Sequence, residues 1–172
     1  MTVEGTRYPA MVRWVHWSSA GLVLVAYLTS ESAGEASGAD WHIFAGLLLL
    51  LLFPLHLAAL RWKRRACSSW PKPSRPAERV AAITIHGALF LFLVVQPLLG
   101  LLSLWAAGDP LPIPFTAVAV PPLLDLGAAG GDLFEEMHEA VGSIFYGVIA
   151  LHVFASLWHQ FVRHDATLRR ML

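Results

Sequence analysis

Histidines are the residues in this chain best suited to chemistry, and their spacing shows how they would be arranged. His138 and His152 lie fourteen positions apart in a long apolar stretch, and His42 and His56 repeat that spacing earlier in the chain. Fourteen residues of α-helix span roughly 21 Å and close to four turns, so one helix face would present two imidazoles at two depths. Imidazole is a good ligand for iron, copper and zinc. The spacing therefore predicts two metal or cofactor sites on one helix.

Four charge-free stretches are long enough to carry these histidines through a membrane. The chain is 56% hydrophobic and 14% charged, whereas soluble domains have roughly 25% charged residues. The stretches cover residues 14–30, 41–60, 80–108 and 140–162, and a spanning helix needs about 17 to 25 residues. We predict an all-α integral membrane protein. Its single domain, 1–172, would be a four-helix transmembrane bundle with helices at about 9–29, 41–62, 76–107 and 133–163.

The connecting segments suggest where these helices begin and bend. Asp40 is placed to cap the second helix, and Asp132 followed by Glu135 resembles a capping box for the fourth. Pro54 should kink the second helix, because it removes a backbone hydrogen bond. The proline-rich connection 108–131 is too long for a simple turn. Loops of that length usually cover something.

Positive charge is confined to three parts of the chain. All twelve Lys and Arg residues lie within residues 7–13, 61–79 and 163–170, and the other two connections have none. By the positive-inside rule, both termini and the middle connection are cytoplasmic. The outer connections and the start of the fourth helix are acidic instead, through Glu31, Glu35, Asp40, Asp109, Asp125, Asp132, Glu135, Glu136 and Glu139.

The residue one turn after each histidine separates candidate ligands from the rest. A flat macrocycle against a helix needs a small residue there, since residues i and i+4 share a face. His16, His42, His138 and His152 are followed at that spacing by Ala20, Gly46, Gly142 and Ser156. His56, His86 and His159 are followed by Leu60, Phe90 and Arg163. The first four are therefore the predicted ligands.

Depth in the membrane then pairs these four ligands. His42 and His138 each begin a helix at the outer face, whereas His152 lies toward the inside, where His16 can meet it. Two bis-histidine sites without a Cys-x-x-Cys-His motif predict two non-covalent, six-coordinate b-type haems. Structural zinc is excluded because its ligands converge on one point.

His56 is an alternative to His16 as a ligand. It repeats the double spacing, the arrangement found in the cytochrome b of quinol-oxidising respiratory complexes, and periodicity alone would choose it. Leu60 on the same face and Pro54 in the same helix argue against it.

The chain also resembles the bacterial di-haem cytochrome b561 family over nearly its whole length. The resemblance is carried by segments that follow one another at the family's spacings: Arg7-Tyr8 with His16-Trp17, Trp41-His42 with Gly46, Arg61-Trp62, His86 with Pro97 to Gly100, His138 with Gly142, and Leu151-His152 running to Asp165 and Leu168.

This resemblance implies a function and a ligand set. It implies a multi-pass protein of the bacterial inner membrane that passes single electrons to or from the quinone pool, with ubiquinone as a further cofactor. The family's ligands match His42 with His138 for the outer haem and His16 with His152 for the inner one. At His56 the family usually has an arginine that faces haem propionates, so we expect His56 and His86 to contact propionate or quinone.

Three other functions remain as alternatives. Within the family, the chain would be a superoxide:ubiquinone oxidoreductase or a haem-bearing anchor subunit for a redox partner. Outside it, the chain would be a non-redox anchor or small transporter that uses histidines as polar contacts between helices. The expected partners are membrane lipid, quinone and a basic redox protein at the acidic outer face, and no nucleic acid is expected.

Overall fold

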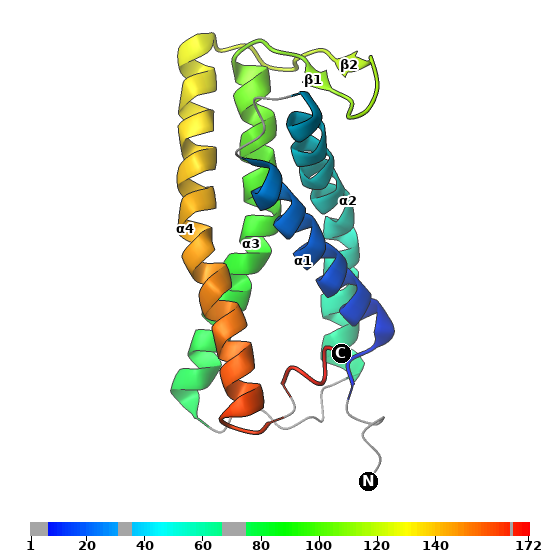
Figure 1. Cartoon of the computed structure of the whole chain (residues 1–172), viewed down its shortest axis with the longest axis vertical. Helices are drawn as coiled ribbons and strands as arrows, with labels where there is room; N and C mark the ends of the chain where they lie inside the picture. The colour runs from blue at the N-terminus through cyan, green and yellow to red at the C-terminus, as the bar shows by residue number, and fades with distance from the viewer. Residues whose placement is uncertain (1–6, 31–35, 67–74, 166) are drawn as a thin grey trace.

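The described chain is a long helical bundle with a small β-hairpin at one end (Figure 1). The computed structural model describes residues 7–30, 36–66, 75–165 and 167–172. They form helices α1 (Ala10–Ser30), α2 (Ala36–Ala66), α3 (Pro76–Ala106) and α4 (Ala128–Phe161), with strands β1 (Leu111–Pro112) and β2 (Ala119–Val120) between α3 and α4. We call the hairpin end the outer end. The opposite end, where the described chain begins at Arg7 and ends at Leu172, is the inner end.

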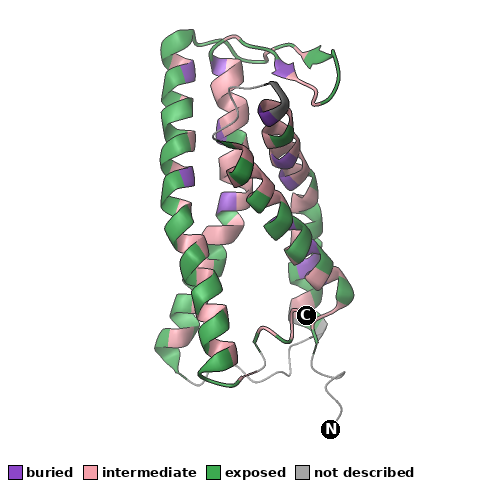
Figure 2. Ribbon diagram, in the orientation of Figure 1, coloured by how far each residue is buried: buried purple, intermediate pink, exposed green. Residues whose placement is uncertain are grey.

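Three helical stretches in the described residues are long and apolar enough to cross a membrane: Gly38–Lys63, Pro76–Ala106 and Ala128–Phe161. The outward faces fit this, because large apolar side chains such as Leu51 and Ile144 are exposed, and Figure 2 shows exposed positions along almost all of α4. The predicted helical membrane bundle is therefore supported. Helix α1 has 21 residues, and Arg13 and His16 reduce the hydropathy of its first half. Its role as a fourth span stays a prediction.

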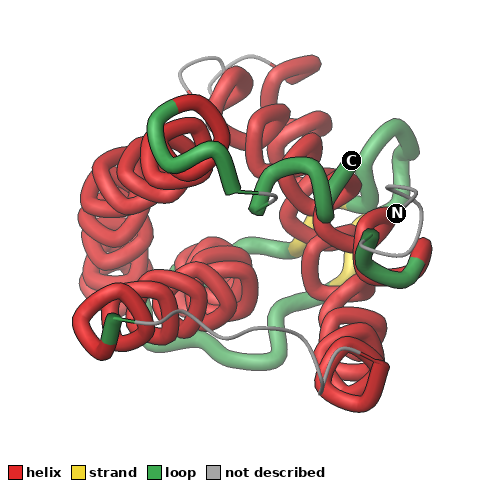
Figure 3. Tube along the Cα trace, turned by 90° about the horizontal axis from the view of Figure 1, so that it is seen from below, coloured by secondary structure: helices red, strands yellow, loops and turns green. Residues whose placement is uncertain are grey.

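The helices are arranged as two close pairs. Helix α1 packs along α2, and α3 packs along α4, whereas α2 and α3 share a smaller contact. Among the described elements, α4 packs closely with α3 alone. Seen from below, the helices stand around the long axis with the two strands at the far end (Figure 3). The bundle thus consists of two helix pairs that face each other.

The long connection between α3 and α4 covers the outer end of α2, as its length predicts. Strands β1 and β2 pair antiparallel, with Leu111 opposite Val120. Phe115, between them, has a φ of 62°, and its ring centre lies 4.9 Å from that of Trp41 and 5.6 Å from that of Phe44. The connection therefore joins the α3/α4 pair to the start of α2.

Both predicted helix caps are wrong, because the two helices begin earlier. Helix α4 starts at Ala128, after Gly127 with a φ of 73° and no side-chain cap. The Gly127 N–H donates to Asp125 Oδ1 at 2.9 Å, so this turn starts the helix and Asp132 lies inside it. Helix α2 starts at Ala36, which puts Asp40 inside that helix too. The helix runs on through Pro54.

At the inner end, Asp165 turns the chain after α4. Its carboxylate accepts hydrogen bonds from His159 Nδ1 at 2.6 Å and from the Thr167 N–H at 2.9 Å. Burial opposes ionisation, but the bonds from Thr167 and His159 prevail and hold the pKa of Asp165 below its usual value. The chain then runs back toward α1.

Candidate haem-binding sites

The four predicted ligands lie in two pairs. The ring centres of His42 and His138 are 5.9 Å apart, with the ring planes at 73°. Those of His16 and His152 are 6.3 Å apart, at 64°. Two imidazoles on one iron have centres about 6 Å apart, because each metal–nitrogen bond is roughly 2 Å long and each nitrogen lies about 1 Å from its ring centre. Both separations suit an iron shared by two rings.

Each of these histidine pairs bridges the two halves of the bundle. His16 belongs to α1 and His42 to α2, whereas His138 and His152 both belong to α4. Helix α4 does not pack closely with either α1 or α2 in the described residues. The side chains thus meet where the helix backbones stay apart, which is the arrangement that a flat cofactor between helices requires.

Backbone carbonyls set the tautomer of both outer histidines. His42 Nδ1 lies 2.9 Å from the Ala26 carbonyl oxygen, and His138 Nδ1 lies 3.0 Å from the Gln96 carbonyl oxygen. A carbonyl can only accept, so each Nδ1 carries the proton and each Nε2 presents a lone pair. This is the outer-shell hydrogen bond usual for histidines that bind metals.

The His138 ring sits on a glycine of α3. A Cβ atom added to Gly100 would lie 3.0 Å from His138 Cε1. Gln96 also binds the backbone of α4, because its Nε2 donates to the His138 carbonyl oxygen at 2.9 Å. Nothing in the sequence alone marks Gln96 and Gly100 as site residues. The only signal for them was their position beside Pro97 in the family resemblance.

The inner pair has a different environment. Among the described contacts, the ring nitrogens of His16 and His152 have no hydrogen bond. The His16 ring instead packs edge-on against the Trp17 ring, with the two ring centres 5.3 Å apart. The His86 ring lies 5.2 Å from that of His152. Its Nδ1 donates to the Ala82 carbonyl at 2.6 Å, which leaves the Nε2 lone pair free of this bond. His86 is therefore a neighbour of the inner pair.

His56 points at α1 rather than at His152. Ser19, buried in α1, donates its hydroxyl proton to the Val15 carbonyl at 2.8 Å. His56 Nε2 lies 3.3 Å from the same Ser19 oxygen, and its Nδ1 lies 3.4 Å from the Leu52 carbonyl oxygen of its own helix. Both ring nitrogens of His56 thus have a polar partner within α1 or α2. This geometry disfavours His56 as a ligand and favours a polar contact between α1 and α2.

Comparison with known proteins agrees with this picture. Residues 7–172 match the family described as prokaryotic cytochrome b561. The chain belongs to that family. It is similar to the "Probable superoxide oxidase CybB" of Yersinia pestis, at 28% identity covering 96% of both chains. "Cytochrome b561 homolog 1" of Escherichia coli K12 is 27% identical over 92% of this chain and 93% of its own.

A more distant similarity has the same extent. "Cytochrome b562" of Cereibacter sphaeroides is 26% identical, covering 92% of this chain and 90% of its own. Membership of the cytochrome b561 family makes the chain a membrane electron-transfer protein that binds b-type haem. The family assignment and the haem prediction are confirmed at this level.

In this cytochrome b561, the four small residues predicted to face haem have different surroundings. A Cβ on Gly46 would lie 3.6 Å from Pro97 Cβ, and one on Gly142 would lie 3.1 Å from Gln96 Nε2. Ser156 Oγ donates to the His152 carbonyl at 2.9 Å, and Ala20 is exposed. Gly46 and Gly142 thus also serve contacts with α3. The haem-packing role of the four stays a prediction.

Replacing Gly100 with Ala should weaken binding of the outer haem. The added methyl would meet the His138 ring at 3.0 Å, so the ring must shift by a few tenths of an ångström, which weakens its hydrogen bond to the Gln96 carbonyl. Loss of an outer-shell partner typically reduces metal affinity roughly 10- to 100-fold. The measurement is haem content after purification. Gly87→Ala is the matched control, because a Cβ there would meet nothing within 4 Å. Equal haem content in the two variants would contradict the prediction.

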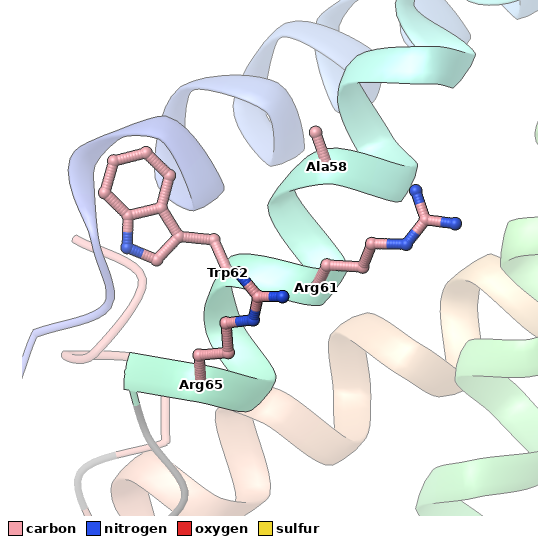
Figure 4. A pocket seen from close by; sticks show the side chains of 4 residues that line it. All are labelled: Ala58, Arg61, Trp62 and Arg65. Atoms are coloured by element: carbon pink, nitrogen blue, oxygen red, sulfur yellow. The ribbon is translucent and has the colours of Figure 1, made fainter.

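A basic pocket opens at the inner end of α2. Ala58, Arg61, Trp62 and Arg65 line a cavity of about 590 Å³, and Figure 4 shows these side chains on successive turns of α2. The two arginines are four residues apart, so they share a helix face. The pocket lies just where the apolar part of α2 ends, at Lys63. Its charge and indole suit the headgroup layer of a membrane.

Proposed function

We propose that this cytochrome b561 carries single electrons between the two faces of the bacterial inner membrane through two b-type haems. His42 and His138 would bind the outer haem iron, and His16 and His152 the inner one. The observation that carries the proposal is the pair of bridging histidine contacts, at 5.9 and 6.3 Å, at two levels of one helix. The two α4 ligands are roughly 21 Å apart along the helix axis.

The proposed chemistry follows from full axial ligation. Haem supplies one-electron redox chemistry when bound, and two imidazoles leave no open position for oxygen, which favours electron transfer. The chain's own work is to hold four Nε2 lone pairs in position. At the outer site, the carbonyls of Ala26 and Gln96 do this by fixing the ring orientation. Little rearrangement is then needed when an electron arrives.

Quinone is the proposed partner at the inner haem. Reduction of a quinone to a quinol takes two electrons and two protons, so two one-electron transfers and a proton source are needed. Histidine is the side chain best suited to move protons near neutral pH. His86 lies beside His152 with its Nε2 outside the Ala82 bond, and His56 is one helix away. We assign both to contacts with quinone or with haem propionates.

The experiment that tests this function is a redox titration of the purified protein with a haem count. We expect two b-type haems per chain, two one-electron steps, and quinol-dependent reduction of the haems in proteoliposomes. A protein without haem would favour the alternative of a non-redox anchor or transporter. A single haem per chain would contradict the two-site arrangement.

Membrane topology follows from charge. With both termini and residues 61–79 in the cytoplasm, the hairpin connection is periplasmic. Cys67 is the only cysteine; it falls outside the described residues but within the basic connection. In spheroplasts, a membrane-impermeant maleimide should label a Leu123→Cys, Cys67→Ser variant directly, and should label the native chain only after permeabilisation. Leu123 is 77% exposed. The reverse pattern would invert the orientation.

Superoxide oxidation is the second candidate function. It is favoured by the relative from Yersinia pestis, which is named a probable superoxide oxidase and aligns with this chain over 96% of its length. In that reaction, two superoxide anions would each give up one electron and become oxygen, and one ubiquinone would take up both electrons with two protons; His42 and His138 would hold the haem on the outer side. The outer surface is acidic, and superoxide is an anion, so electrostatic repulsion would slow their encounter. A haem-bearing anchor subunit would use the same two haems with a soluble redox partner in place of superoxide.

A further inference from the structure

The inner histidine pair joins two helices, α1 and α4, that do not pack closely on each other in the described residues. His16 and His152 nevertheless lie at iron-sharing distance. Within the part of the chain that the structure describes, their rings also have no counterpart to the carbonyl contacts that orient His42 and His138.

Tyr27 of α1 does donate to the Gly142 carbonyl of α4 at 2.8 Å, and its ring centre lies 4.2 Å from that of Tyr146. Tyr27 is eleven residues from His16, however, so a separate contact is needed to hold α1 and α4 together at the inner end.

The C-terminal residues make that connection. Residues 167–172, which we call the strap, run from the end of α4 to the start of α1 (Figure 1). The Tyr8 N–H donates to the Arg170 carbonyl at 2.9 Å, and Trp17 Nε1 donates to the Met171 carbonyl at 2.8 Å. Arg13 Nη1 donates to the Leu172 carbonyl. Three groups at the start of α1 thus hold three successive strap carbonyls.

The strap also packs against the apolar core at this end. The side chain of Met171 lies on a buried cluster of Val12 and Val15 from α1 and Ala59 from α2. Asp165 fixes the turn from which the strap starts. Trp17, which binds the strap through its indole N–H, also contacts the His16 ring. The strap therefore ties α4 to the tryptophan next to a predicted ligand.

The outer end has a counterpart. Phe115 of the hairpin connection packs on Trp41, with the two ring centres 4.9 Å apart. Trp41 is the residue before His42. We call this contact the outer clamp. At each end, a segment attached to the α3/α4 pair crosses the bundle and holds the tryptophan beside the ligand on α1 or α2. The two devices differ in support, because carbonyls also orient the outer ligands.

We propose that the strap and the outer clamp are positioning devices, each of which sets the ligand geometry of one haem, with Trp17 and Trp41 as their contacts. This rests on the proposed haem ligands. The strap has the larger task, since His16 lacks a ring hydrogen bond in the described chain. Neither tryptophan is a ligand; each acts through the histidine next to it.

The test measures each haem separately in full-length protein. Low-temperature EPR gives a distinct low-spin signal for each bis-imidazole haem, and transfer to apomyoglobin gives each dissociation rate. Trp17→Phe keeps an aromatic ring at this position but removes the indole N–H that donates to the Met171 carbonyl. Trp14→Phe is the matched control, since Trp14 is 74% exposed on the same helix. A variant without residues 169–172 removes all three acceptors. Phe115→Ala opens the outer clamp, with Leu123→Ala as its control.

We expect Trp17→Phe to release the inner haem roughly 10-fold faster, as loss of an outer-shell partner does, with the outer signal unchanged. Removal of residues 169–172 should have a greater effect on the same haem. Phe115→Ala should shift only the outer signal. Rates equal to those of Trp14→Phe, or equal loss of both haems, would overturn the proposal. Wild-type protein with fewer than two haems would refute the proposed function instead.

Discussion

Replacing His138 with Ala should remove the outer haem and leave the inner one, so that haem content falls from two per chain to one. The His138 ring is held by the Gln96 carbonyl and rests on Gly100, and no other histidine in the described chain contacts the His42 ring. No replacement ligand is therefore at hand. A pyridine haemochrome assay per mole of protein, with a redox titration to show which step is lost, measures the effect.

His16 and His56 give the matching test at the inner site. His16→Ala should lose the inner haem, whereas His56→Ala should keep both. The reason is that His56 Nε2 contacts the Ser19 hydroxyl, while the His16 ring faces His152. Loss of the inner haem from the His56 variant, with retention in the His16 variant, would establish the double-spaced arrangement of His42 and His56 instead.

The histidine pairs were predictable because ligand positions leave a periodic signal in a sequence. The spacing of His138 and His152 along one helix and the small residues after them need no knowledge of the fold. His56 shares the periodicity, however, and Leu60 and Pro54 were the sequence features against it; its contact with Ser19 adds a reason that only the structure gives. That contact depends on how α1 rotates against α2, which helix propensity does not specify.

The supporting contacts were not predictable for a related reason. His42 and His138 are oriented by main-chain carbonyls of Ala26 and Gln96, and every residue has a carbonyl, so no side-chain pattern marks them. The strap carbonyls of Arg170 and Met171 likewise leave no signal in the sequence. The predicted start of α4 was wrong because of the local backbone conformation. Asp132 has the side chain of a helix cap, but a turn at Gly127 with positive φ begins α4 earlier.

The outer face should repel superoxide and attract cations. Asp109, Asp132, Glu135, Glu136 and Glu139 are all exposed at that end, and residues 80–162 contain no Lys or Arg to balance them. The last three lie in α4 within one turn of His138. Fields of this kind change encounter rates by roughly 10- to 1,000-fold at low salt, and salt screens them over about 8 to 10 Å at physiological ionic strength.

We therefore expect opposite salt dependences for two donors of the outer haem. Reduction by superoxide should become faster as salt rises, because repulsion is screened, whereas reduction by a small basic redox protein should become slower. An uncharged quinol serves as the control donor, whose rate should change little. Neutralising Glu135, Glu136 and Glu139 to Gln should reduce both slopes, since these charges surround the His138 site. Stopped-flow absorbance of the outer haem at several salt concentrations measures all three rates. If superoxide reacts near the diffusion limit and slows with added salt, the surface attracts it, and a protein donor with a basic docking face loses its main support.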